Sequence, residues 1–141
     1  ESSLLAGKKF ANKLWNAARF VLQQTAISKQ QPKTEKISKE NKEIMEKLNK
    51  IIISASDDIE NYNFGQALHN LYNFVWHEYA DKYIEYSKTK NDDETKETLS
   101  LTFVNIIKLL HPFMPFITEE IWSMLPNMNK KMLIIEKWPQ I

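Results

Sequence analysis

Apolar side chains recur every three to four residues along most of this chain, which is the period of an amphipathic α-helix. The pattern covers four long segments, at about residues 3–27, 38–60, 64–88 and 93–110. A shorter helical segment begins at Pro115 and is ended by Pro126. The sequence therefore predicts an all-α protein, an antiparallel helix bundle of about four long helices plus a short fifth helix.

Polar segments separate the predicted helices. Residues 28–43 form a polar loop and the start of the second helix, and Ile37 is their only apolar side chain. Ser38 is expected to cap that helix, and Asp92 or Asp93 to cap the fourth. We expect one domain over residues 1–141, with an extended tail at 127–141, because the chain is long enough for a single sizeable core.

The third predicted helix is apolar around most of its circumference. We expect such a helix to be central and packed on several sides. Its apolar residues are Phe64, Ala67, Leu68, Leu71, Tyr72, Phe74, Val75, Trp76, Tyr79, Ala80, Tyr83 and Ile84.

The composition excludes several classes of site. The chain has no cysteine, so disulfides, zinc–thiolate sites and thiol nucleophiles are ruled out. Two isolated glycines cannot build a phosphate-binding loop, and three scattered histidines do not form a metal-ligand pattern. We therefore expect no catalytic residue, metal or cofactor in this chain.

The hydropathy pattern predicts a protein of the cytoplasm. No apolar run reaches the roughly 18 residues that a membrane span requires. The apolar run LLAG near the N-terminus is too short for a secretory signal. We expect no association with a membrane, and we expect a monomer.

The net charge of +1 conceals an asymmetry along the chain. Residues 1–50 carry 11 basic and 5 acidic side chains, a net +6, whereas residues 51–141 carry 8 and 13, a net −5. A basic N-terminal third suits an anionic partner such as a nucleic acid. Charge runs are more often ordinary solvated faces, so charge alone leaves both interpretations open.

A helical wheel over Phe10–Phe20 and its flanks separates two faces. At about 100° per residue, one face is apolar and consists of Phe10, Leu14, Ala17, Ala18, Val21 and Leu22. The other face is polar and consists of Lys9, Asn12, Asn16, Arg19 and Gln23. Phe20 falls outside the apolar face, beside Lys13 and one turn from Asn16. This aromatic residue among basic and amide side chains needs an explanation.

Two interpretations of Phe20 are open. Another element, such as the C-terminal MLIIEKWP, could cover the ring. Alternatively, the ring could stack on an unpaired base, because proteins bind single-stranded nucleic acid through aromatic faces set in a basic groove. Asn side chains can bond base edges, while Lys and Arg reach phosphates and base acceptors. In the second interpretation, Phe20 should be accessible to solvent.

Three segments of the chain resemble one protein family. GKKFANKLWNAARF (7–20) is similar to the start of the helical anticodon-binding domain of valyl-tRNA synthetases, commonly Gly-Arg-Asn-Phe-x-Asn-Lys-Leu-Trp-Asn-Ala-x-Arg-Phe. NYNFGQALHNLYNFVWHEYADKYIEYSK (61–88) resembles the central helix of that domain. LLHPFMPFITEEIW (109–122) is similar to its Leu-His-Pro-x-x-Pro-Phe-Ile-Thr-Glu-Glu-Ile-Trp segment. The segments occur in the family's order and, with the closing Trp138-Pro139, extend over nearly the whole chain.

The resemblance implies a non-catalytic module that recognises the tRNA anticodon stem-loop. The parent enzyme would ligate valine to its tRNA, using ATP and Mg in a catalytic domain absent from this chain. Lys13 and Phe20 match the family positions that lie at the anticodon bases. The expected RNA-binding residues are Lys8, Lys9, Asn12, Lys13, Asn16, Arg19 and Phe20, and the expected partners are tRNA and the rest of the synthetase chain.

Some positions depart from the family pattern. Lys8-Lys9 replaces Arg-Asn, which keeps positive charge but loses arginine's bidentate fork. Ala80-Asp81-Lys82-Tyr83 replaces Cys-Asp-Trp-Tyr. A different class of function also remains open, a helical protein–protein module in which the basic first helix docks an acidic partner.

Overall fold

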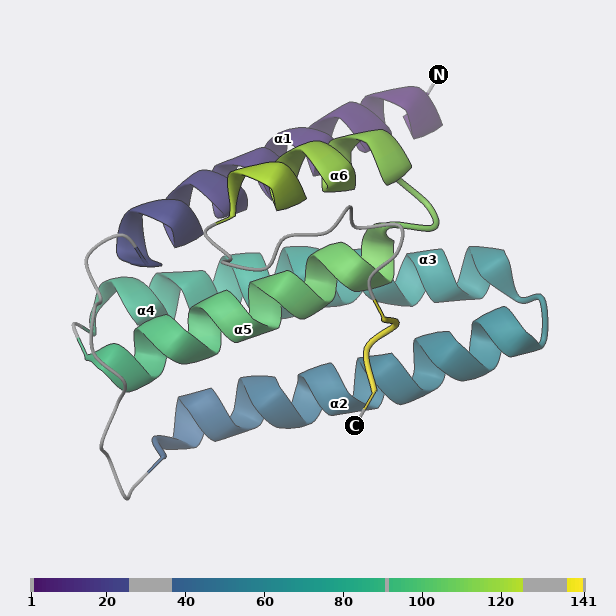
Figure 1. The fold of residues 1–141 in the computed structure, drawn as a ribbon. Helices are drawn as coiled ribbons and strands as arrows, with labels where there is room; N and C mark the ends of the chain where they lie inside the picture. The colour runs from purple at the N-terminus through teal and green to yellow at the C-terminus, as the bar shows by residue number, and fades with distance from the viewer. Residues whose placement is uncertain (1, 26–36, 91, 126–136, 141) are drawn as a thin grey trace.

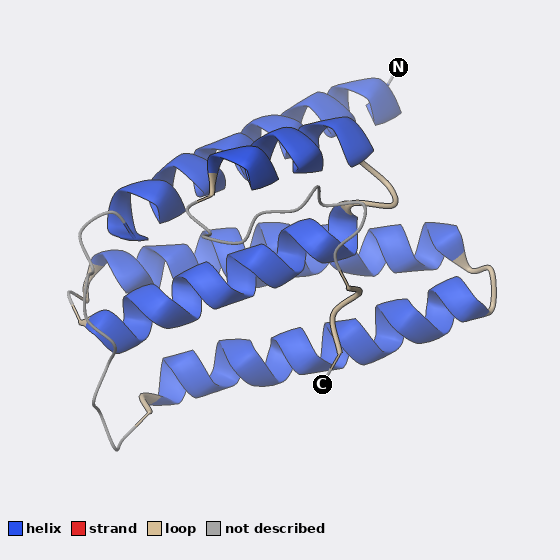
Figure 2. Cartoon of the chain, in the orientation of Figure 1, coloured by secondary structure: helices blue, strands red, loops and turns tan. Residues whose placement is uncertain are grey.

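The computed structural model describes residues 2–25, 37–90, 92–125 and 137–140 (Figure 1). Every regular element in these residues is a helix (Figure 2). The elements are α1 (Ser2–Thr25), α2 (Lys39–Glu60), α3 (Phe64–Asn73), η1 (Phe74–Ile84), α4 (Glu85–Lys88), α5 (Asp93–Leu110) and α6 (Pro115–Met124). The all-α prediction is confirmed.

The predicted third helix is one continuous rod made of α3, η1 and α4. The junction residues Phe74 and Glu85 keep right-handed helical backbone angles, so the rod does not break between Phe64 and Lys88. Its middle, η1, differs from the expectation because it is π-helical. Such wider turns are rare and occur frequently at functional sites.

The rod lies between the other long helices. It contacts α2 along α3 and η1, α1 through η1, and α5 through α3 and α4. In Figure 1, α5 and α6 lie nearer the viewer, whereas α1 and the rod lie behind them. The rod is therefore central and packed on several sides, as the sequence predicts.

The helix ends follow local sequence chemistry. The Ser38 hydroxyl accepts a hydrogen bond from the Asn41 backbone N–H, and the Asp92 carboxylate accepts one from Thr95 at 2.7 Å. Both predicted caps are thus confirmed, with Asp92 in the cap position of α5. α5 ends at Leu110, just before His111-Pro112, and Pro115 starts α6.

A single apolar cluster joins the helices. α1 contributes Phe10, Leu14 and Val21, all nearly inaccessible to solvent. Most of the rod's apolar side chains from Leu71 to Ile84 are buried, but Phe64 and Leu68 near its start are 50% and 39% exposed, so the expected burial does not extend to that end. None of the helices within the described residues is long and apolar enough to cross a membrane.

The tail is described only at residues 137–140. There the Trp138 indole N–H donates a hydrogen bond to the Ser56 hydroxyl of α2 at 2.8 Å. Residues 28–36 of the predicted loop, and residues 127–136 and 141 of the predicted tail, lie outside the described residues. The extended conformation of the tail and the single-domain boundaries therefore remain predictions.

A buried polar cluster connects α2, the rod and α5. The Asn41 amide donates to the Glu94 carboxylate at 2.8 Å and to the Thr95 hydroxyl at 3.3 Å. Its carbonyl oxygen accepts a hydrogen bond from the Tyr83 hydroxyl at 2.6 Å. Asn41 is only 1% exposed, so water cannot replace these partners without a rearrangement.

Asn41→Ala should lower the free energy of unfolding by about 1–3 kcal/mol, because buried polar partners lose their hydrogen bonds. Chemical denaturation followed by circular dichroism measures the change. Lys42→Ala, at the exposed next position, is the control and should change stability by less than about 0.5 kcal/mol. Equal stability of the two variants would contradict this role for Asn41.

Candidate nucleic-acid interface

An open groove of about 460 Å³ lies between α1 and the rod. α1 contributes its polar face, and the rod contributes the strip that its other neighbours leave uncovered. The lining residues are Lys9, Asn12, Lys13, Asn16, Ala17 and Phe20 from α1, and Trp76, Ala80, Asp81, Ile84, Glu85 and Lys88 from the rod.

The groove brings together five of the seven residues predicted for RNA binding, namely Lys9, Asn12, Lys13, Asn16 and Phe20. Arg19 lies beside it in a smaller depression that also includes Asn12 and Asn16. Its guanidinium donates a hydrogen bond to the Asn16 side-chain oxygen at 3.2 Å. Lys8 is exposed but does not line the groove.

Phe20 is half-buried. Part of the ring packs against the core, and the rest lines the groove. The Lys88 ammonium lies 5.7 Å from the ring centroid, within the range of a cation–π interaction. The expected access to solvent is therefore partial, and the described tail residues lie at α2, through Trp138 and Ser56.

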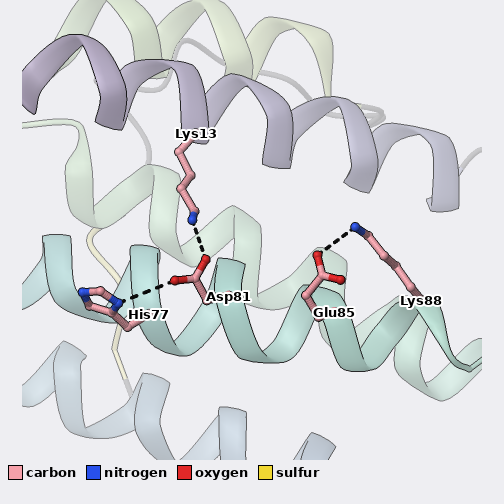
Figure 3. Close-up of polar contacts among 5 residues, drawn as sticks. All are labelled: Lys13, His77, Asp81, Glu85 and Lys88. Carbon is pink, nitrogen blue, oxygen red and sulfur yellow. Dashed lines mark hydrogen bonds and ion pairs between the residues drawn. The ribbon is translucent and has the colours of Figure 1, made fainter.

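Lys13 extends from α1 toward the rod (Figure 3). Its ammonium donates a hydrogen bond to Asp81 Oδ1 at 2.5 Å. The same ammonium lies 4.4 Å from the centre of the Trp76 ring. Two groups of the rod thus fix the position of a cation that belongs to α1.

Two more charged contacts lie along the same side of the rod (Figure 3). His77 Nδ1 is 3.6 Å from Asp81 Oδ2 and forms an ion pair when the imidazole is protonated. Lys88 pairs with Glu85 at 2.8 Å, within one turn of α4. The groove therefore contains three lysines, at positions 9, 13 and 88, and two carboxylates, at 81 and 85.

The sequence prediction missed the contribution of the rod to this site. Trp76 was assigned to the apolar set of a central helix, and neither carboxylate was singled out. Part of the signal was present, because Asp81, Glu85 and Lys88 follow one another at intervals of four and three residues and share one face of an α-helix. Trp76 lies five residues before Asp81 and joins that side only through the wider π-helical turns of η1. Nothing in the pattern indicated which stripe faces α1.

The groove offers three kinds of interaction to a ligand. Phe20 and Trp76 present aromatic surface, asparagines present amide donors and acceptors, and lysines present positive charge. This combination is typical of surfaces that bind unpaired nucleotides. The described residues contain no cluster of three or more His, Asp or Glu side chains that could hold a metal ion.

A family model for the anticodon-binding domain of tRNA ligase matches residues 41–141. The chain belongs to this family. The match covers α2, the rod, α5 and α6, so it is independent of the α1 residues from which the site was predicted.

Relatives extend the similarity of this anticodon-binding domain through α1. Valine–tRNA ligase of Thermotoga maritima is 41% identical over an alignment of 140 residues, which covers 96% of this chain and 16% of that protein. Valine–tRNA ligase of Pseudothermotoga lettingae is 44% identical over an alignment of 138 residues, which covers 95% of this chain and 16% of that protein. The chain thus spans about one sixth of the length of these relatives.

A solved structure shares the fold of this anticodon-binding domain. It is a crystal structure of the ternary complex of Agrobacterium radiobacter K84 agnB2 LeuRS with tRNA and LeuAMS. The TM-score is 0.70 at 21% identity, over 96% of this chain and 16% of that chain. At this identity the likeness concerns the fold alone.

The Lys13 ammonium lowers the pKa of the Asp81 carboxyl below its ordinary value of 3.8, chiefly through their hydrogen bond. Burial opposes this shift, and attraction to Lys13 and His77 adds to it. When the pKa of a carboxyl is lower in the folded than in the unfolded state, its charge stabilises the fold at any pH above the unfolded-state pKa. This contribution is lost as the pH falls through the folded-state pKa. Asp81 is half-exposed, so the contribution to stability is small.

An NMR titration of the side-chain carboxyl carbons should give Asp81 a pKa below 3.8. Lys13→Met, which keeps a similar chain length, should raise the pKa of Asp81 because the ammonium is removed. An unchanged Asp81 pKa in Lys13→Met would show that the contact between α1 and the rod does not form in solution.

Proposed function

We propose that this domain binds the anticodon stem-loop of a tRNA through the groove between α1 and the rod. The observation that carries the proposal is the convergence of Phe20, Lys13, Asn12 and Asn16 on one open groove. Phe20 stacks on an anticodon base, and Lys13 and the asparagines contact base edges. Lys8, Lys9 and Arg19 hold phosphates along the rim.

The proposed parent protein is a valine–tRNA ligase. The two relatives described above carry this name, and one sixth of their length corresponds to the present chain. Valine activation, with ATP and Mg, would then take place outside these 141 residues, and this domain would contribute only recognition of tRNA. We further propose that the parent acts as a monomer in the cytoplasm.

An RNA-hairpin titration at two salt concentrations tests the proposal. A hairpin with a valine-type anticodon loop should bind the 141-residue chain more tightly than the same hairpin with its central anticodon base changed. A wrong base typically costs about 1–3 kcal/mol. Equal affinities would reject anticodon recognition and favour a non-specific basic surface, and no binding would favour the protein–protein module.

Phe20→Ala should weaken hairpin binding by about 1–3 kcal/mol, because it removes one base–aromatic stack. The dependence of affinity on salt should stay unchanged, because no charge is lost. Filter binding measures both quantities, and circular dichroism checks the fold, since part of the ring packs on the core.

Lys9→Ala is the matched variant on the same helix. It should flatten the plot of log affinity against log salt by about 0.7–0.9, the value for one phosphate contact. Opposite behaviour of the two variants, a slope change for Phe20 and none for Lys9, would contradict the assigned roles.

A further inference from the structure

The contact between Lys13 and Asp81 raises a question about the groove. Binding RNA favours positive charge, yet the rod places a carboxylate at the centre of the surface that would meet a polyanion. Asp81 is 48% exposed, so its charge is not hidden from an incoming phosphate. A carboxylate here lowers the affinity for nucleic acid in general, and a local role should offset that cost.

The immediate effect of Asp81 is to hold the Lys13 ammonium. A lysine side chain is a flexible chain with a compact charge, which by itself does not distinguish a phosphate from a base acceptor. Here one N–H of the ammonium is directed to Asp81, while the charge lies 4.4 Å from the Trp76 ring centre. Two further N–H donors of the ammonium remain available to a ligand.

The Trp76 ring under the ammonium is itself fixed. It stacks on Tyr72 with 5.4 Å between ring centroids, and Tyr72 packs against Phe10 of α1 at 5.0 Å. Phe10 is buried in the core. The Lys13 ammonium therefore lies over a stack of fixed aromatic rings, and its hydrogen bond to Asp81 holds it from the side.

We propose that Asp81 is a positioning residue for base discrimination, which holds Lys13 toward a base edge and away from the phosphates. This inference rests on the proposed function of the groove. In this role Asp81 lowers the overall affinity for RNA through its charge and contributes to discrimination instead. It confines the lysine to one geometry in which a matching base acceptor bonds the remaining N–H groups and a wrong base does not.

Glu85 provides a matched control one turn further along the rod. It also lines the groove and is also paired with a lysine, Lys88. That pair lies within α4, however, and Glu85 does not hold Lys13. Removing either carboxylate changes the charge of the groove equally, but only removal of Asp81 releases the ammonium of α1.

The experiment measures the dissociation constants of the 141-residue chain for two hairpins, one with the valine-type loop and one with its central base changed. Asp81→Asn should bind the hairpin with the changed base about two- to fivefold more tightly at low salt, because a repulsive charge is gone. The valine-type hairpin should lose more from the freed Lys13 ammonium than it gains from removal of that charge. The ratio between the hairpins should fall by about tenfold, a change of about 1.4 kcal/mol. Glu85→Gln should show the same gain in affinity with an unchanged ratio.

A charge-swapped double variant, Lys13→Asp with Asp81→Lys, distinguishes a pair whose ammonium contacts the base from a pair that only ties the two helices together. It restores an ion pair between α1 and the rod but moves the ammonium to the other helix. A tie that only holds the helices together would recover the wild-type ratio, and that result would overturn the proposal. Loss of discrimination in the swapped variant, with an intact fold by circular dichroism, is the expected result.

The outcomes separate this inference from the proposed function. Equal binding of both hairpins by the wild-type chain rejects anticodon recognition and the role of Asp81 together. Discrimination by the wild type that persists in Asp81→Asn leaves the proposed function in place and overturns the role of Asp81 alone.

Discussion

The packing of the rod formed by α3, η1 and α4 is the constraint on which the rest of the structure depends. Its tyrosines at 79 and 83 are buried against α5 and α2, and both hydroxyls find partners there, Tyr79 with the Leu99 carbonyl and Tyr83 with Asn41. These bonds fix the rotation of the rod about its own axis. The stripe from Trp76 to Lys88 is then the part left to meet α1, and the groove follows from this orientation.

The two tyrosines show how the core accommodates buried polar hydroxyl groups. Burial raises the pKa of Tyr79 and the pKa of Tyr83 well above the ordinary value of a tyrosine hydroxyl. Both side chains therefore stay neutral hydrogen-bond donors at any physiological pH. Among the described residues, every buried side-chain polar atom has a partner. A rod held in this way can present its opposite stripe in a fixed geometry, which base recognition requires.

In the proposed function, the groove balances attraction for RNA against selectivity among RNA sequences. Lysines from both walls attract a polyanion, whereas Asp81 and Glu85 reduce that attraction and take up specific partners. α1 alone, with its lysines, asparagines and Phe20, would bind nucleic acids without sequence specificity. The rod adds the fixed aromatic ring of Trp76 and the hydrogen-bond acceptor of Asp81 to this surface. The same helix that organises the core thereby also organises the groove.

The sequence by itself determined the helices and the face of α1. A helix has a fixed angular period, so the positions of Lys13, Asn16 and Phe20 on one side follow from their spacing alone. The Ser38 and Asp92 caps likewise depend on residues only three positions away. Only the tertiary structure decided what lies opposite that face. Lys13 and Asp81 are 68 positions apart, and their contact depends on how two helices rotate and cross when the core packs. The periodicity of one helix contains no information about that packing. For this reason the placement of Lys13 and Phe20 on one face of α1 could be predicted, and the placement of Trp76 and Asp81 opposite that face could not.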